Sequence, residues 1–337
     1  MERPPTLATP DRGLLADGAA GGAHPLPVAN AETAWSPVPR VRERRQVEWP
    51  TVGLTALCYL AWGTITLLAA QTGPWLAAIL LAPVVALHSS LQHETLHGHP
   101  FPSRSLSDAT VFPALGLFIP YERFRDTHLA HHRDEHLTDP YDDPESNYLD
   151  PSVWTGLARP VRVLLAFNNT LAGRMILGPL LGLAVFWRRE MRLVARGERA
   201  VIRGWAMHLL GLVPVALWLS AAAMPLPAYL LGAYLGLSIL KVRTFLEHRA
   251  HEKVAGRSVI VEDRGPLALL FLNNNYHAVH HAHPKVAWYR LPAFYRARRD
   301  VFLARNRGYR YASYAEVFRH HLLKPKDPVP HPLRGRE

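Results

Sequence analysis

The chain has 337 residues, of which 49% are hydrophobic and 19% charged, with a formal net charge of +11. Its single cysteine, Cys58, excludes an intrachain disulfide, a cysteine-ligated zinc module and an iron–sulfur cluster within one copy of the chain. The lysines and arginines are spread along the polar segments without a recognition or stacking motif, so we expect anionic lipid headgroups and no nucleic acid as partners.

Residues 1–46 are rich in Pro, Gly and Ala and show no apolar periodicity. They also lack the short apolar core and cleavage site of a signal peptide. This composition predicts a disordered cytoplasmic arm. The arm ends in a basic cluster that contains Arg40, Arg42, Arg44 and Arg45.

Four apolar runs follow in two pairs, and each pair is divided by a short break that contains proline. Runs of this length can cross the hydrocarbon core of a bilayer as helices. The pattern predicts an all-α membrane protein built from two transmembrane helical hairpins. The expected spans, about four in number, are 52–70, 75–92, 205–223 and 228–246.

The distribution of positive charge predicts the orientation of these hairpins. Both turns lack Lys and Arg, whereas basic stretches at 40–45, 123–133, 188–203 and 290–299 fall between or outside the hairpins. The positive-inside rule then places both termini in the cytoplasm. We expect a multi-pass membrane protein.

Two further apolar segments are too short or too polar to be simple spans. The segment 161–187 is interrupted by Arg162, Asn168, Asn169 and Arg174, and the segment 111–120 is short. Both are expected to form interfacial or re-entrant helices. The membrane domain should cover 47–310, and 311–337 should form a basic cytoplasmic tail whose prolines and charges from 324 onward indicate disorder.

Three histidine clusters lie in the polar segments, with the sequences HETLH (93–97), HLAHH (128–132) and HAVHH (277–281). On a helix His93 and His97 point the same way, whereas adjacent histidines diverge by about 100° and can serve two different ions. A single histidine of this kind is usually a core or solvated residue. The joint pattern predicts a polyhistidine metal site, although imidazole alone does not select iron over zinc, copper or manganese.

In this order, and separated by hairpins, the three boxes resemble those of the membrane fatty acid desaturase superfamily, which includes alkane hydroxylases and carotenoid oxygenases. The flanking sequences, such as HETLHGHP and NNNYHAVHHAHP, are most similar to those of bacterial members. We therefore expect the protein in the bacterial inner membrane. The resemblance covers roughly residues 50–300. It implies a cytoplasmic helical cap that carries the boxes, two non-haem iron ions as cofactor and O2 as co-substrate.

The resemblance also implies a ligand set, carried over position by position. It comprises His93, His97, His128, His131, His132, His277, His280 and His281, with His248 as a ninth ligand at the end of the fourth span. Neighbouring histidines that lie off the motif spacing are expected to be outer or solvated groups: His99, His136, His251 and His283. An acidic stretch with Asp139, Asp142, Asp143 and Glu145 either orients ligating imidazoles or pairs with Arg125 and Arg133.

The favoured function is O2-dependent desaturation of a fatty acyl chain in lipid metabolism, with a lipid or fatty acyl substrate, and hydroxylation of a lipid, alkane or other apolar substrate is the alternative. Because the chain has no cofactor-binding fingerprint of its own, electrons must come from a separate protein. The family implies a ferredoxin, or a cytochrome b5-like protein with its reductase. Arg296, Arg298 and Arg299 belong to a basic face that either docks this donor or meets anionic lipid.

Two other classes remain open from sequence alone. HETLH matches the HExxH motif of zinc proteases, in which Glu94 would be the general base, but an intramembrane zinc protease would leave both HxxHH boxes idle. A metal transporter would place its ligands near the middle of the bilayer, where only His88 and His208 are candidates.

Overall fold

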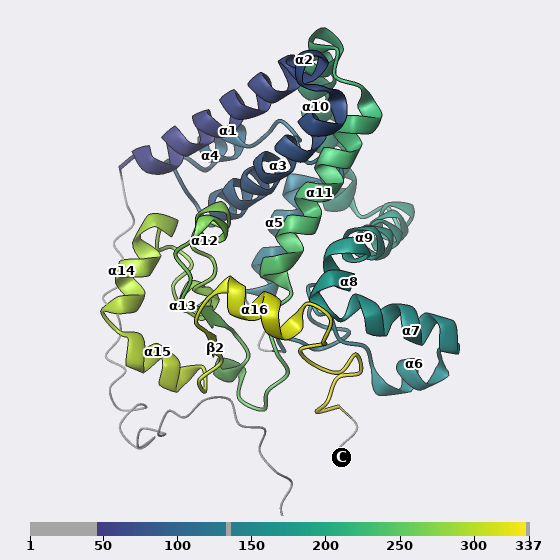
Figure 1. Cartoon of the computed structure of the whole chain (residues 1–337), viewed down its shortest axis with the longest axis vertical. Coiled ribbons are helices and arrows are strands. Elements are labelled where there is room, and N and C mark those ends of the chain that lie inside the picture. The colour runs from purple at the N-terminus through teal and green to yellow at the C-terminus, as the bar shows by residue number, and fades with distance from the viewer. Residues whose placement is uncertain (1–45, 133–135, 335–337) are drawn as a thin grey trace, which may run out of the picture.

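A computed structural model describes residues 46–132 and 136–334. The predicted N-terminal arm therefore lies, except for residue 46, outside the described residues. The fold is mostly helical (Figure 1). The turn at α2 (Ala69–Thr72) and the turn between α10 (Arg199–Ala222) and α11 (Leu226–Thr244) lie together at one end of the molecule, and the elements from α12 (Pro266–Leu270) to α16 (Tyr314–His321) lie toward the other.

The two predicted hairpins are present. The first comprises α1 (Trp49–Leu67), α2 (Ala69–Thr72) and α3 (Pro74–Leu96), and the second comprises α10 (Arg199–Ala222) and α11 (Leu226–Thr244). Gly73 turns the chain with a φ of 91°, in the region that glycine tolerates best, and Pro74 then starts α3. The hairpins pack closely because α11 presents glycines to α3: a Cβ at Gly236 would lie 2.8 Å from Val85.

Among the described residues, three helices are long and apolar enough to cross a membrane: α1, α3 and α10. The fourth expected span, α11, lies along α3 but carries Lys241 and Arg243 in its last turn. Three candidate spans are therefore established by length and composition, and the crossing of α11 remains a proposal.

Residues 111–120 do not form the helix that we expected from their apolar composition. They follow α4 (Arg104–Thr110) and run as a non-helical segment between the helices. Side chains of the bundle satisfy its backbone: Tyr229 donates a hydrogen bond to the Leu115 carbonyl at 2.9 Å, and Trp187 donates to the Phe118 carbonyl at 2.9 Å. Among membrane helices, non-helical backbone is tolerated only where the protein supplies hydrogen-bond partners for its polar groups.

The ambiguous segment 161–187 is divided among three helices, α7 (Arg159–Asn168), α8 (Leu171–Ile176) and α9 (Gly178–Ala195), which follow α6 (Pro151–Gly156). None of them meets the length and composition of a membrane span. α7 exposes Val163 and Phe167, and the interfacial or re-entrant position of this segment stays a prediction.

The cap is assembled from short elements around α5 (Tyr121–His131). In chain order these are η2 (Val254–Gly256), β1 (Ile260–Val261), α12 (Pro266–Leu270), α13 (His277–Ala282), η3 (Trp288–Arg290), α14 (Leu291–Arg296), α15 (Arg299–Arg305), β2 (Arg310–Tyr311) and α16 (Tyr314–His321). β1 and β2 pair in parallel, with Ile260 opposite Arg310.

The C-terminal segment is part of this cap. Tyr314 and Val317 are buried in the core that also contains Phe245 at the end of α11. Farther along, the Lys326 ammonium donates to the His248 carbonyl at 2.8 Å, and Asp327 accepts from the Tyr148 hydroxyl at 2.6 Å. The expectation of disorder from residue 324 is therefore wrong for residues 324–334, which pack beside a predicted metal ligand.

Candidate metal centre

Five of the predicted ligands converge from three helices, and we call them the five-histidine group. Their candidate ligand atoms all lie within 4.8 Å of one another. The end of α3 supplies two, α5 and the residue after it supply two, and α13 supplies one. The members are His93, His97, His128, His132 and His280.

The other four predicted ligands form a second group under the same criterion, which we call the four-histidine group. Its members are His131, His248, His277 and His281. The groups are neighbours, because the rings of His132 and His281 stack with their centroids 4.1 Å apart. All nine imidazoles thus lie in one continuous cluster at the end of the long helices that is remote from their turns.

Helix geometry explains how each HxxHH box divides between the groups. Residues four apart share a helical face and adjacent residues do not. His128 and His132 therefore enter the five-histidine group, while His131 enters the other. In α13 the division is reversed, with His277 and His281 in the four-histidine group and His280 in the five-histidine group. This is the arrangement expected if neighbouring imidazoles serve two ions.

The spacing between ring nitrogens suits a metal ion. The Nε2 atoms of His93 and His132 each lie 3.0 Å from His128 Nε2, and His248 Nε2 lies 2.9 Å from that of His131 and 3.0 Å from that of His277. Two ligand nitrogens at right angles, each about 2.1 Å from a shared ion, are separated by about 3.0 Å.

Three further nitrogens support the same fit. The Nε2 atoms of His97, His280 and His281 are buried and have no hydrogen-bond partner in the part of the chain that is described. Unsatisfied buried acceptors are costly, and two metal ions would satisfy these three, one ion binding His97 and His280 and the other binding His281. The residues present therefore fit two metal ions with nitrogen ligands.

The electrostatics of the cluster favour neutral imidazoles. Burial, followed by the neighbouring imidazoles, lowers the pKa of His97, His248, His277, His280 and His281 well below its ordinary value. The same causes lower the pKa of His132 to about 3. His131 is the exception: burial lowers its pKa, but Glu145 and Asp143 outweigh burial and raise it to about 9. Neutral imidazole is the form that binds a metal.

Several of the predicted ligand rings are oriented by acceptors at their Nδ1 atoms. His128 Nδ1 lies 2.9 Å from Glu145 Oε1, and His131 Nδ1 lies 2.8 Å from Asp143 Oδ1. A ring that donates from Nδ1 keeps the Nε2 lone pair for a metal. Of the two predictions for the acidic stretch, orientation of imidazoles therefore holds for Asp143 and Glu145.

The rest of the acidic stretch plays other parts. Asp139 pairs with Arg334 and accepts backbone hydrogen bonds within its own turn, and Asp142 is exposed. Arg125 pairs with Asp108 and Asp126 and not with this stretch. Arg133 lies outside the described residues.

Sequence reasoning missed two further partners of the Nδ1 atoms of predicted ligands. Asn274 Oδ1 lies 3.2 Å from His277 Nδ1, and the Ser258 hydroxyl lies 3.2 Å from His248 Nδ1. Asn274 precedes its histidine by three residues, and that spacing was an available signal. Ser258 comes from the segment that precedes β1, so only the fold identifies it.

Glu94, within HETLH, belongs to neither histidine group and contacts other residues. Its Oε1 atom accepts a 2.9 Å hydrogen bond from the Trp288 amide and lies 3.8 Å from His99 Nε2, while His99 Nδ1 contacts Glu48 at 2.8 Å. These contacts link the end of α3 to the start of η3 and to the residue before α1. They do not give Glu94 the position of a general base beside a zinc-bound water.

The intramembrane histidines are also engaged elsewhere. His88 contacts the Tyr59 hydroxyl at 3.4 Å, and His208 Nε2 contacts the Leu117 carbonyl at 2.8 Å. Neither belongs to a candidate metal group among the described residues. A transport site at the middle of the helices therefore has no support.

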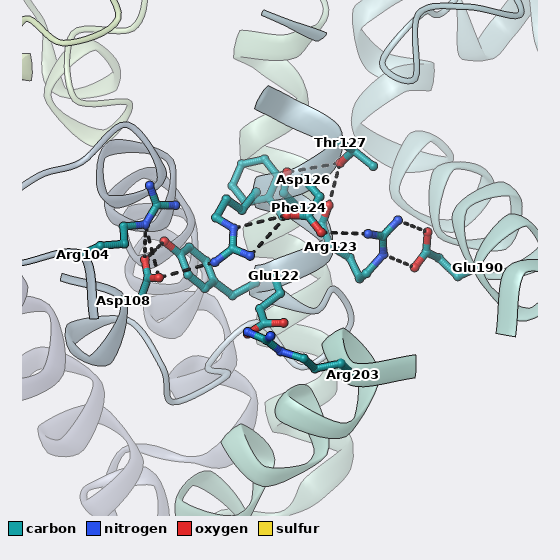
Figure 2. Close-up of polar contacts among 11 residues, drawn as sticks. Arg104, Asp108, Glu122, Arg123, Phe124, Asp126, Thr127, Glu190 and Arg203 are labelled. Carbon is teal, nitrogen blue, oxygen red and sulfur yellow. Dashed lines mark hydrogen bonds and ion pairs between the residues drawn. The ribbon is translucent and has the colours of Figure 1, made fainter. Parts of the chain in front are cut away.

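A buried ion pair holds α5, and with it the second box, against α9 (Figure 2). Arg123 Nε lies 2.7 Å from Glu190 Oε2, and Nη2 lies 3.2 Å from Oε1. Trp205 of α10 donates to the same carboxylate at 3.2 Å. The Glu190 side chain is only 1% exposed. Sequence reasoning missed this pair, because the two residues are far apart in the chain and each looks like an ordinary surface charge.

A sequence model of the family described as fatty acid desaturase matches residues 40–313. The chain belongs to the fatty acid desaturase family. A β-carotene ketolase from Paracoccus sp. (strain PC1) is 29% identical over 259 residues, which cover 72% of this chain and 90% of the relative. Family membership and this relative make the chain an oxidoreductase of the membrane di-iron superfamily.

A cavity of about 330 Å³ in this desaturase family member reaches the candidate centre. His128 and His248, one from each group, line it. Apolar side chains from α5, α9, α11 and the 111–120 segment form much of its wall, including Leu117, Phe124, Phe186 and Leu240. Such a chamber can hold an apolar chain beside the metal ligands.

The orienting carboxylates give a testable expectation. Glu145→Ala should weaken metal binding by about 10- to 100-fold, because His128 loses the acceptor that orients its ring. Glu145→Gln should bind metal nearly as well as the parent, since its amide oxygen can still accept from Nδ1. Titration of the metal-free protein with Fe(II), followed by absorption, measures the affinity.

The matched control is Asp142→Ala, which removes an exposed carboxylate from the same loop. It should leave the affinity unchanged. Equal losses of Fe(II) affinity in Asp142→Ala and Glu145→Ala would show that metal binding depends only on the net charge of the loop.

Proposed function

We propose that the chain is a membrane-bound, O2-dependent di-iron oxidase whose nine clustered histidines are the iron ligands. The observation that carries the proposal is the division of these buried and half-buried imidazoles into two adjacent groups, in a chain of the fatty acid desaturase family. The family implies a hydrophobic substrate and a membrane setting. We propose desaturation of a fatty acyl chain as the reaction.

When bound, two irons would supply the activation of O2 by sharing the electrons that its cleavage requires. The protein's own residues do the positioning. The nine imidazoles hold the ions, Asp143 and Glu145 keep two of the rings in the orientation that ligation requires, and the apolar cavity wall excludes water and aligns the substrate chain. Glu94 has no part in the chemistry, because its carboxylate is engaged with Trp288 and His99.

Hydroxylation or ketone formation on an apolar substrate is the second candidate, and the β-carotene ketolase relative favours it. Desaturation and oxygenation share the first removal of hydrogen. They then differ in whether a second hydrogen leaves or oxygen is added, and the position of the substrate carbon decides between them.

The orientation and the electron donor belong to the same proposal. We place both termini and the histidines on the cytoplasmic side of a bacterial inner membrane, where a ferredoxin, or a cytochrome b5-like protein with its reductase, would deliver electrons. Arg296 and Arg298 are candidates for docking an acidic donor. Arg299 is less available, because its guanidinium pairs with Glu262 at 2.5 Å.

The test is a product analysis with iron-loaded protein in lipid nanodiscs, supplied with a ferredoxin, its reductase and NADPH. Palmitic acid, palmitoyl lipid and β-carotene are offered separately under O2 and under argon, and products are identified by mass spectrometry. We expect an O2-dependent acyl product that lacks two hydrogens. A hydroxyl or keto product would replace desaturation by the second candidate, and no O2-dependent product with any substrate would overturn the oxidase.

A further inference from the structure

The cavity that reaches the histidines is lined by charged groups as well as apolar ones. Among its lining residues, four carry positive charge and four carry negative charge. The cations are Arg174, Lys241, Arg243 and Lys326, and the anions are Asp143, Glu145, Glu247 and Asp327. Because buried charges are normally paired, each of these eight groups is expected to have a partner of opposite charge.

Every carboxylate in the lining already has a close partner. Asp143 and Glu145 contact ligating imidazoles, Glu247 lies 2.8 Å from Arg243 Nε, and Asp327 pairs with Lys326. Two cations therefore remain without a carboxylate partner among the described residues. These are Arg174 and Lys241.

Arg174 is buried, with 8% of its surface exposed. Its guanidinium donates only to neutral oxygens: the Asn168 carbonyl at 3.1 Å, Asn169 Oδ1 at 3.3 Å and Asn147 Oδ1. A guanidinium has five N–H donors in a fork that matches a carboxylate, so donors remain for a ligand.

Lys241 belongs to the last turn of α11 and lines the same cavity. No hydrogen bond or ion pair of its ammonium occurs within residues 46–132 and 136–334. The two cations lie over consecutive turns of one helix, α9. A Cβ at Gly178 would lie 3.0 Å from Arg174 Cδ, and one at Gly182 would lie 3.6 Å from Lys241 Nζ.

We propose that Arg174 and Lys241 form a subsite for the carboxylate of a long-chain fatty acid, whose apolar chain fills the rest of the cavity. This inference rests on the proposed function and narrows its substrate class. An acid would compensate the buried charge of Arg174 and the half-buried charge of Lys241, while the surrounding Phe186, Leu237 and Leu240 contact its methylenes. A hydrocarbon such as β-carotene has no group that could do so.

The test measures equilibrium binding to the iron-loaded protein in detergent, so that turnover is not needed. Palmitic acid and hexadecanol have chains of equal length, and only the first carries a charge at neutral pH. The parent should bind palmitic acid at least about tenfold more tightly than hexadecanol, as expected for a charge-assisted hydrogen bond in a buried site. Competition against a fluorescent fatty acid measures both affinities.

Variants of Lys241 test whether the preference for the acid over the alcohol depends on its charge. Lys241→Met keeps the length of the side chain without its charge and should bring the affinity for the acid close to that for the alcohol, with the alcohol unaffected. Lys241→Arg should retain the preference for the acid. The Arg203 side chain of α10 is 72% exposed. Arg203→Gln removes this cation and should change neither the affinity for the acid nor that for the alcohol.

Equal affinities for acid and alcohol in the parent would overturn the subsite, whatever the variants do. An equal loss of both ligands in Lys241→Met would also overturn it, because the side chain would then act through packing alone. Iron content is measured on the same samples. Absence of iron would count against the proposed function and leave the preference for the acid as a separate result.

Discussion

Substitution of one histidine from each group is expected to remove one iron at a time. The parent should contain about two irons per chain, and His131→Ala and His280→Ala about one each, because each variant damages one group only. Loss of even an orienting partner typically weakens a metal site by about 10- to 100-fold, so loss of a ligand should cost more. Oxidation of the substrate should fall at least about 100-fold in both variants, since O2 cleavage requires the pair.

Metal analysis by mass spectrometry on gel-filtered protein provides the measurement. His320→Ala is the control, because His320 is exposed on α16 and lies outside both groups. It should keep the iron content of the parent. One zinc per chain, lost with His97→Ala but retained in His131→Ala and His280→Ala, would overturn the di-iron proposal in favour of a mononuclear zinc site.

Glu190→Ala is expected to cause the largest loss of stability of any substitution outside the histidine cluster. It leaves the Arg123 guanidinium buried beside α9 without its two-point partner (Figure 2). Removal of one member of a buried ion pair costs about 3–5 kcal/mol of unfolding free energy. For a chain of this size, that corresponds to a decrease of roughly 6–20 °C in the apparent Tm. Thermal unfolding in detergent, followed by tryptophan fluorescence, measures it.

Arg203→Ala is the matched control, because it breaks a contact of 3.5 Å between the exposed Arg203 side chain of α10 and Glu122 of the same helix α5. Exposed ion pairs contribute about 0–1 kcal/mol, so the apparent Tm should change little. If Glu190→Ala unfolds no earlier than Arg203→Ala, the buried pair does not stabilise the contact between α5 and α9.

The hairpins could be predicted because their signals are local. Long uncharged runs and the breaks at Gly73–Pro74 and Pro225 are read directly from neighbouring residues, and α1, α3, α10 and α11 lie where these signals placed them. The segment 111–120 has a similar apolar composition but is not helical. Its conformation depends on hydrogen bonds from Tyr229 and Trp187, and residues so distant in the chain leave no local signal.

The acidic stretch shows the same limit at the candidate site. Its composition indicated that some carboxylate would meet the histidines, but Asp139, Asp142, Asp143 and Glu145 are chemically alike. The path of the loop selects Asp143 and Glu145, which contact two rings of α5, and leaves Asp142 exposed. The tail is a second example: its prolines and charges indicated disorder, yet Lys326 donates to the His248 carbonyl.

By itself, the sequence determined that this is a helical protein with membrane-length apolar segments, in the fatty acid desaturase family, with three histidine boxes at helix ends. Those properties depend on residue type, spacing and helical periodicity, which act over a few residues. Only the tertiary structure decided how the nine histidines divide into five and four, which carboxylates orient them, and that Arg174 and Lys241 face one cavity. These features depend on the approach of α3, α5, α9, α11 and α13, and packing between distant segments sets that approach.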